Sequence, residues 1–408
     1  MSLAEARALD AADPLRLVRE RFVLPDGVIY LDGNSLGALP KATSPHLFDV
    51  IERQWGEDLI TSWNKYGWID WPQRIAAKLA PIVGAKPNEL LIADSTTVCL
   101  FKLLAAAVGA RPGRSTILTQ QDNFPTDVYA AEGLARLMPG LRLKAIPAGQ
   151  LEAALDEDTA VLLLTHVDYR SGARHDMHSL DRAAHAAGAL TLWDLSHSAG
   201  AIELNLNDSG CDLAVGCGYK YLNGGPGAPA FLYVSEKLQG ALESPISGWM
   251  GHADPFAFAG SYTPAADIRR FLTGTPSILA LAGLERGLDA FAGVSIAEIE
   301  AKAERITQFF IEAVERLCRR EVRLASPRDA MLRGSHVCFA HPQGYAVMQA
   351  LIACGVIGDF RPPDLIRFGF APLYNRFEEA WCAAAALADV LGSREWDQPR
   401  FLERARVT

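Results

Sequence analysis

The sequence of 408 residues lacks any stretch of about 18 uninterrupted apolar residues, so it predicts no transmembrane helix. It has no run of lysine and arginine, and its formal net charge is −9, which argues against nucleic acid or an anionic membrane as a partner. Residues 1–10 carry acidic side chains and no apolar core region, unlike a signal peptide. We therefore expect a cytoplasmic protein.

Metal-binding and disulfide patterns are also missing. The seven cysteines never occur as Cys-x-x-Cys, and the nine histidines form no ligand pattern. This distribution is typical of reduced thiols in the cytosol and predicts no metal site. No Gly-x-Gly-x-x-Gly motif follows the first short apolar run, at residues 28–31. Residues 32–37, which come next, read Asp-Gly-Asn-Ser-Leu-Gly. A dinucleotide-binding dehydrogenase is therefore disfavoured.

Half of the residues are hydrophobic, which is enough for a substantial core. Apolar strand patterns alternate with helical patterns through the first two thirds of the chain, which predicts a mostly parallel sheet covered by helices on both faces. The expected strands are 90–93, 115–119, 143–146, 160–165, 189–193, 212–215 and 230–234. After about residue 275 long helices and a strand at 336–340 predict a smaller α+β domain, which we expect a continuous helix to join to the first.

One lysine stands in an unusual setting. Lys220 follows the apolar segment 213–215 and lies between two tyrosines, with glycine before it and three more glycines after it. A lysine at the end of a buried strand is costly unless it is paired or chemically used, and glycines allow the backbone to approach a ligand closely. The pattern favours a lysine that forms a Schiff base with a carbonyl cofactor. A surface lysine in a glycine-rich turn is the alternative.

Two other strand ends carry polar side chains. Asp194 ends a buried strand pattern and needs a cationic partner, which could be His197, Lys220 or the protonated ring nitrogen of a pyridine cofactor. Thr96 and Thr97 open an apolar helical pattern directly after the strand at 90–93. The free N–H groups and the dipole of such a helix start suit a phosphate, although ordinary capping would use the same residues.

These features resemble the kynureninase family, which belongs to the fold-type-I pyridoxal phosphate (PLP) enzymes with aminotransferase-class-V-like sequences. The similar segments run in the expected order along the chain and are 30–37, 123–127, 193–200, 218–227, 248–252, 271–276 and 366–375. Segment 218–227 is the most specific of them. The resemblance implies an α/β fold-type-I architecture in three parts. An N-terminal segment (1–45) packs with the small domain, a large domain (46–285) binds PLP, and the small C-terminal domain (286–408) is α+β.

The resemblance also implies which residues hold the cofactor. Lys220 is similar to the Schiff-base lysine, Asp194 to the carboxylate that keeps the pyridine nitrogen protonated, and Tyr219 to a tyrosine that binds the phosphate and relays a proton. Further implied contacts are the phosphate-binding Thr96 and Thr97, the ring-stacking Phe124, the second acid Asp127, the hydroxyl of Thr165, the histidine His197, and Trp249 and Thr275 from the second subunit of a homodimer.

On the substrate side, Arg367 resembles the arginine that clamps the substrate α-carboxylate with its rigid fork. Arg361 competes with it for this role. Ser35 and Trp68 are expected to wall the aromatic end of the substrate. Thr275 stands where some relatives have asparagine, so its bonding is open.

The implied activity is PLP-dependent hydrolysis of L-kynurenine, and of 3-hydroxykynurenine, to anthranilate or 3-hydroxyanthranilate and L-alanine by Cβ–Cγ cleavage in tryptophan degradation. A cysteine desulfurase or an amino-acid epimerase on the same fold is the alternative. A desulfurase needs a mobile cysteine in a C-terminal loop, whereas Cys338 and Cys354 lie in strand and helix patterns. A cofactor-free binding protein would have lost Lys220 or Asp194, and both are present.

Overall fold

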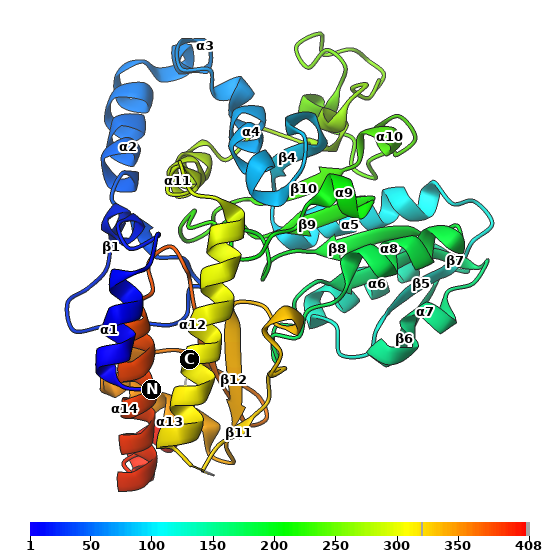
Figure 1. Ribbon diagram of the computed structural model, residues 1–408. Coiled ribbons are helices and arrows are strands. Elements are labelled where there is room, and N and C mark those ends of the chain that lie inside the picture. Colours follow the sequence, from blue (N-terminus) through cyan, green and yellow to red (C-terminus); the bar gives the residue numbers. More distant parts are fainter. Residues whose placement is uncertain (320, 405–408) are drawn as a thin grey trace.

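A seven-stranded sheet forms the centre of the large domain in the computed structural model, which describes residues 1–319 and 321–404 (Figure 1). Its strand order is β4-β10-β9-β8-β7-β5-β6, and only the two pairings made by β10 are antiparallel. The predicted mostly parallel sheet is thus confirmed. The strands are β4 (Leu90–Ala93), β5 (Thr116–Gln120), β6 (Arg142–Ile146), β7 (Thr159–Thr165), β8 (Leu190–Asp194), β9 (Leu213–Gly216) and β10 (Ala230–Val234).

Both faces of this sheet are buried, because successive strand residues point to opposite sides. In β7, Leu162 and Leu164 enter one apolar core, whereas Val161 and Leu163 enter the other. Two layers of helices therefore enclose the sheet, as expected for parallel strands. The helices of this domain are α4 (Trp71–Val83), α5 (Thr96–Gly109), α6 (Pro125–Leu137), α7 (Leu151–Ala154), α8 (Met177–Ala186), α9 (Leu206–Ser209), α10 (Glu236–Gln239) and α11 (Ile278–Asp289).

The small domain contains a four-stranded antiparallel sheet of order β11-β12-β15-β14 with its own apolar core. Its strands are β11 (Arg323–Leu324), β12 (His336–Ala340), β14 (Asp359–Arg361) and β15 (Leu365–Gly369), and its helices are α12 (Ile296–Leu317), α13 (Gly344–Ala353), α14 (Phe377–Ser393) and α15 (Pro399–Leu402). The expected continuous helix between the domains is confirmed, because α12 runs from the core of the large domain, where Ile299 packs, into that of the small domain, where Ile306 packs. Ser295 and Glu298 form a capping box that starts α12 anew after α11 has ended.

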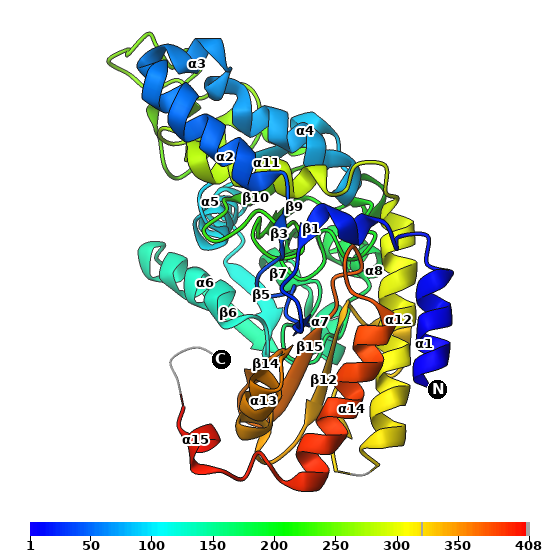
Figure 2. The same cartoon turned by 90° about the vertical axis from the view of Figure 1, so that its left-hand side faces the viewer.

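The N-terminal segment crosses from one domain to the other. Helix α1 (Leu3–Ala11) lies beside the helices of the small domain (Figure 2) and packs against α14. Strand β2 (Ile29–Tyr30) pairs in parallel with β13 (Val356–Ile357) of the small domain. Strand β1 (Phe22–Val23), which precedes β2, pairs with β3 (Leu39–Pro40), which follows it. After β3 the chain enters an arm made of α2 (Thr43–Asp49), the π-helix η2 (Val50–Glu57) and α3 (Ser62–Lys65).

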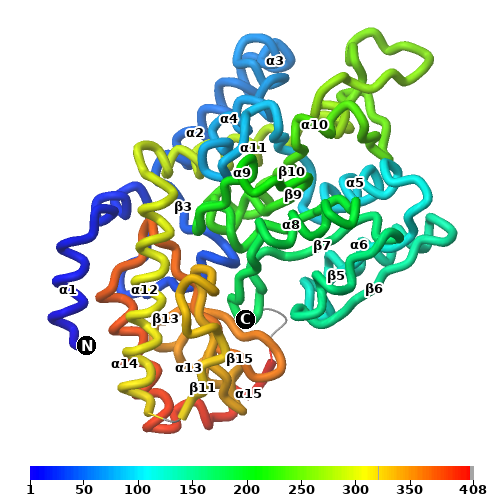
Figure 3. The backbone as a smooth tube through the Cα atoms, turned by 45° about the vertical axis from the view of Figure 1, so that its right-hand side comes forward, coloured from blue at the N-terminus to red at the C-terminus, as the bar shows by residue number. Residues whose placement is uncertain are grey.

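Figure 3 shows this arm and the loop near residue 255 projecting at the end of the molecule away from the small domain. The short 3₁₀ turns are η1 (Val18–Arg21), η3 (Leu59–Thr61), η4 (Trp68–Asp70), η5 (Pro87–Glu89), η6 (Ala148–Gln150), η7 (Trp249–Gly251), η8 (Ile268–Phe271) and η9 (Ala330–Leu332). Among the helices of the described ranges, none has the length and apolar character needed to cross a bilayer.

A buried ion pair fastens the N-terminal segment to the small domain. Asp13 Oδ2 lies 2.6 Å from Lys302 Nζ on α12, and both side chains are about nineteen-twentieths buried. Burial lowers the pKa of Lys302, and Asp13 opposes this effect. Removing one partner of such a pair leaves an unpaired buried charge.

We therefore expect Asp13→Ala to lower the free energy of unfolding by about 3–5 kcal/mol in chemical denaturation. The matched control is Asp397→Ala, which breaks an exposed pair with Arg394 and should cost at most about 1 kcal/mol. Equal effects of the two substitutions would contradict a structural role for the buried pair.

Candidate functional site

The predicted site residues converge at one edge of the large sheet. Strand β7 ends at Thr165 and β8 at Asp194, and the chain leaves β9 into the loop that carries Lys220. Strands β5, β7, β8 and β9 are parallel, so their carboxyl ends share this edge, where ligands bind in open α/β sheets. Strand β4 has the same direction, because it and β9 are both antiparallel to β10. The start of α5 at Thr96 therefore lies at the same edge.

The amine of Lys220 points toward polar and aromatic partners within the protein. Its Nζ lies 3.1 Å from His197 Nε2 and 5.9 Å from the centroid of the Phe124 ring. The following turn is closed by two hydrogen bonds, from Asn223 N–H to the carbonyl oxygen of Lys220 and from Gly224 N–H to that of Gly218, both at 2.9 Å. Lys220 is therefore an inward-facing residue at a strand end.

His197 provides a neutral partner for that amine. Burial, followed by the positive charge of Lys220, holds the pKa of His197 well below its ordinary value. The ring is thus uncharged at neutral pH, and Nε2 can accept a hydrogen bond from the lysine ammonium. Its Nδ1 is buried and has no hydrogen-bond partner in the part of the chain that the structure describes.

Two buried carboxyl groups lie beside the lysine. Asp194 Oδ1 accepts hydrogen bonds from the N–H of Ser196 at 2.8 Å and from its hydroxyl at 2.5 Å. Asp127 Oδ2 accepts one from Thr165 Oγ1 at 3.2 Å. Burial and the charge of Asp194 raise the pKa of Asp127 well above its ordinary value. Burial also raises the pKa of Asp194, and Lys220 opposes this shift.

The start of α5 offers an anion site at the same edge. Ser95 caps the helix by accepting the N–H of Val98 at 3.4 Å, while the preceding N–H groups of the first turn point away from the helix. Thr96 Oγ1 lies 3.1 Å from the Sγ of Cys217, which belongs to the Lys220 loop. Burial and Cys217 raise the pKa of Tyr219, so its phenol keeps its proton at neutral pH. Thr97 is exposed beside Thr96.

Arg367 lies in a buried network rather than on the surface. Its Nε donates to Asp359 Oδ1 at 2.7 Å and its Nη2 donates to Oδ2. Nη1 donates to the carbonyl oxygen of Tyr169 at 2.6 Å, and Nη2 also donates to Ser35 Oγ at 2.9 Å. Ser35 in turn donates to Asp359 Oδ2 at 3.1 Å. The N-terminal segment and both domains thus meet at one guanidinium.

The turn at residues 32–37 contacts the loop that carries Lys220. The N–H of Gly37 donates to the carbonyl oxygen of Tyr219 at 2.8 Å. A Cβ atom at Gly37 would come within 2.4 Å of the carbonyl oxygen of Lys220, so a side chain there would displace the loop. This contact is the physical reason for a glycine at position 37.

Three predicted residues lie outside this cluster. Trp68 is buried between Trp63 and Trp71, and its Nε1 donates to Gln54 Oε1 at 2.8 Å. Trp249 packs beside the exposed Phe256 and Phe258, whereas Thr275 is exposed and borders, with Asp94, a small hollow near the start of α5. Their predicted contacts with substrate or cofactor stay predictions.

Comparison with known proteins agrees with this geometry. A kynureninase from Pseudomonas fluorescens is 48% identical over 408 residues, which cover 98% of each chain. A kynureninase from Burkholderia pseudomallei strain K96243 is 49% identical over 412 residues, which cover 99% of each chain. Residues 299–387 also match the family model of the kynureninase C-terminal domain.

This chain belongs to the kynureninase family.

Solved structures share its fold at low sequence identity. A cysteine desulfurase from Thermococcus onnurineus has a TM-score of 0.79 at 21% identity, covering 92% of this chain and 98% of its own. The cysteine desulfurase CsdA from Escherichia coli has a TM-score of 0.78 at 18% identity, covering 93% and 98%. A C-DES mutant carrying glycine covalently linked to PLP has a TM-score of 0.77 at 18% identity, covering 91% and 99%. The expected fold-type-I architecture is thereby confirmed.

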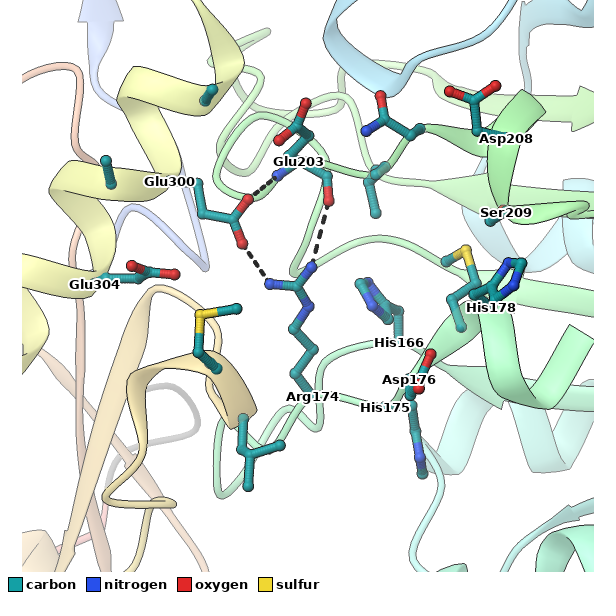
Figure 4. A pocket seen from close by; sticks show the side chains of 17 residues that line it. His166, Arg174, His175, Asp176, His178, Glu203, Asp208, Ser209, Glu300 and Glu304 are labelled. Atoms are coloured by element: carbon teal, nitrogen blue, oxygen red, sulfur yellow. Dashed lines mark hydrogen bonds and ion pairs between the residues drawn. The ribbon is translucent and has the colours of Figure 1, made fainter.

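The candidate site is separate from a hollow of about 740 Å³ between α12 and the α8–α9 region (Figure 4). Arg174 crosses this hollow and pairs with Glu300, which also accepts the N–H of Glu203 at 3.0 Å. His166, next to Thr165 in sequence, lines it. No predicted site residue does so among the lining residues that the structure describes.

Several residues of the site were not expected from the sequence. Asn123 accepts the N–H of Thr165 at 3.0 Å and so joins the β5 loop to β7. Ser196 fixes Asp194, and Asp359 fixes Arg367. The spacing of Asp359 and Arg361 on one face of a strand, opposite Arg367, was a usable signal for the last of these contacts.

The raised pKa of Asp127 predicts a pH effect on the cofactor-free protein. The unfolded carboxyl has a pKa of about 3.9, so the folded state binds this proton more tightly. The stability contributed by Asp127 is present at low pH and is lost as the pH rises toward the folded pKa.

Asp127→Asn should therefore stabilise the cofactor-free protein more at about pH 8 than at about pH 5, with a difference of about 1 kcal/mol or more in denaturant unfolding. A pH-independent effect of the substitution would contradict a protonated Asp127.

Proposed function

We propose that this member of the kynureninase family hydrolyses L-kynurenine, and also 3-hydroxykynurenine, to anthranilate or 3-hydroxyanthranilate and L-alanine, with PLP as cofactor, in tryptophan degradation. The observation that carries the proposal is the placement of the Lys220 amine beside two buried carboxyl groups and a neutral histidine at the ligand-binding edge of the sheet. Family membership supports the substrate.

The residues at this edge fit PLP group by group. The free N–H groups at the start of α5, with Thr96, Thr97 and Tyr219, would hold the phosphate. The buried pair Asp127 and Asp194 lacks a cation other than Lys220 among its nearest groups, and a protonated pyridine nitrogen would supply one.

The remaining contacts concern the ring. Phe124 would stack on it, and Thr165 and His197 would lie beside it. Lys220 would hold the aldehyde carbon covalently.

When bound, PLP withdraws electrons from the amino-acid substrate and so acidifies the C–H bonds at Cα and Cβ. Lys220 takes the proton from Cα, and His197 orients the amine. Water adds to the γ-carbonyl carbon, and the Cβ–Cγ bond breaks to release anthranilate. The electron pair remains on the alanine fragment, whose Cβ receives a proton for which Tyr219 is the source. Kynurenine and one water thus become anthranilate and alanine.

Residues farther from Lys220 orient the substrate. Arg367, whose Nη2 lies 2.9 Å from Ser35 Oγ, binds the α-carboxylate. Ser35 and Trp68 wall the side of the aromatic ring. We place the enzyme in the cytoplasm, consistent with seven cysteines that are all free.

We further propose a homodimer with shared active sites, to which Trp249 and Thr275 of each chain contribute. Two exposed apolar groups support it, because a soluble chain rarely leaves such patches uncovered. The arm carries Phe48, Trp55, Leu59 and Ile60, and the loop carries Phe256 and Phe258, each more than half exposed.

A cysteine desulfurase is the alternative that the fold allows. It would need an accessible cysteine near Lys220. Cys217 is near but buried, and Cys338 lies within β12. Cys354 is exposed, but it caps the end of α13 in the small domain. This arrangement favours the hydrolase.

Replacing Lys220 by alanine should abolish the visible absorbance band of the PLP-loaded protein and lower kynurenine turnover by at least about 10²- to 10⁴-fold, measured by anthranilate fluorescence. Lys144→Ala, on the exposed edge strand β6, is the matched control and should keep both signals. A wild-type protein that binds PLP but releases no anthranilate would refute the proposed substrate.

The proposed dimer predicts a mass near twice that of the 44.2 kDa chain in sedimentation. Phe258→Asp should shift the mass toward one chain, because it buries a charge in the interface. Leu137→Asp, at the exposed end of α6, should leave it unchanged. A wild-type protein that sediments as a monomer would contradict the shared site.

A further inference from the structure

A second arginine accompanies Arg367 at its ion pair. Arg361 ends β14 and Asp359 begins it, so both side chains lie on the same face of the strand. Asp359 is paired directly with Arg367 of β15 across the ladder. Arg361 Nη2 donates to Asp359 Oδ2 at 2.5 Å, and this oxygen also accepts from Arg367 Nη2. Two guanidinium groups therefore converge on one carboxylate oxygen.

Arg367 has few donors left for a substrate. A guanidinium carries five N–H groups. One N–H from Nε and two from Nη2 go to Asp359 and Ser35, and one from Nη1 goes to the carbonyl oxygen of Tyr169. Only one N–H of Nη1 remains, and the side chain is 1% exposed. A two-oxygen clamp on a substrate carboxylate therefore needs a second donor while the Asp359 pair persists.

Arg361 has the donors that Arg367 lacks. Its side chain is 33% exposed, and its single hydrogen bond among the described residues goes to Asp359. Its Nε is buried without a partner. The unpaired donors thus belong to a residue that shares a carboxylate oxygen with Arg367.

The charges of the network favour an anion there. Arg361 and Arg367 bring two positive charges, and Asp359 brings one negative charge. Asp32 is the other carboxyl group nearby, and burial together with Asp359 raises its pKa. While Asp32 holds its proton, one positive charge is uncompensated, and a substrate carboxylate would balance it.

We propose that Arg361 is a substrate-binding residue that supplies the second half of the α-carboxylate site, with Asp359 as the positioning residue that holds both guanidinium groups side by side. This inference rests on the proposed function only in that it requires an amino-acid substrate. It adds to Arg367 a second, partly exposed guanidinium group whose Nη1 makes no hydrogen bond to the described residues.

The test compares two small ligands on the PLP-loaded enzyme. L-Alanine carries the α-carboxylate, and L-alaninamide carries an uncharged amide in its place. Their dissociation constants are measured from the change in the visible absorbance of the bound cofactor. Arg361→Gln should raise the dissociation constant of L-alanine by about 10- to 100-fold, the loss expected for a charge-assisted hydrogen bond. The dissociation constant of L-alaninamide should change by no more than about twofold.

Two further variants separate binding from folding. Arg361→Lys keeps the charge without the fork, so its affinity for L-alanine should fall between those of the wild type and the glutamine variant. Arg323 lies on β11, at the opposite edge of the same sheet, so Arg323→Gln should change the affinity for neither ligand. The kinetic counterpart for Arg361→Gln is a rise in KM for kynurenine that exceeds the fall in kcat.

Unchanged binding of L-alanine to Arg361→Gln would overturn the proposal. So would equal weakening of L-alanine and L-alaninamide, because that result indicates a general distortion of the site. A wild-type enzyme that distinguishes the two ligands through Arg361 but does not cleave kynurenine would refute the proposed substrate and leave the role of Arg361 intact.

Discussion

The desolvation of charge at the carboxyl edge of the sheet is the constraint on which the rest of the structure depends. Burial raises the pKa of both Asp127 and Asp194, and the charge of Asp194 raises that of Asp127 further, while the Lys220 amine and hydrogen bonds from Thr165 and Ser196 oppose these shifts. Such a group of residues is stable only where parallel strands end together and a tight turn returns the chain. Gly224 and Gly37 allow that close backbone approach, and Gly225 and Gly227 adopt the positive φ values of the turn.

A second cluster of charges lies where three parts of the chain meet. Ser35 comes from the N-terminal segment, Tyr169 from the large domain, and Asp359, Arg361 and Arg367 from the small domain. The proposed carboxylate site therefore forms only when the two domains and the N-terminal segment are in place. Substrate binding and domain arrangement would be linked through these contacts, whereas the proposed cofactor contacts of each chain all come from its large domain.

The sequence was sufficient for the sheet and for one half of the site. Strands buried on both faces read as continuous apolar runs, and the rule that ligands bind at strand ends brought Asp194 and Lys220 together without coordinates, whereas Thr165 came from the family resemblance. The other half depends on pairing across a ladder. The spacing of Asp359 and Arg361 places them on one face of a strand, but the partner that they face depends on the register of β14 against β15.

The break between α11 and α12, by contrast, has a local signal. Separate helical patterns lie on either side of residues 290–295, and a capping box at Ser295 starts the second helix. The roles of Trp68, Trp249 and Thr275 depend on surfaces that a second chain would cover, so neither propensity nor the fold of one chain decides them.

The central claim is that Lys220 is the residue to which the cofactor is covalently attached. Its most direct test is reduction of the PLP-loaded protein with borohydride, followed by peptide mass spectrometry. We predict a single pyridoxyl adduct on Lys220, in the peptide that contains Gly218 and Gly224. An adduct on another lysine, such as the buried Lys102, or a loaded protein with no adduct would contradict the account.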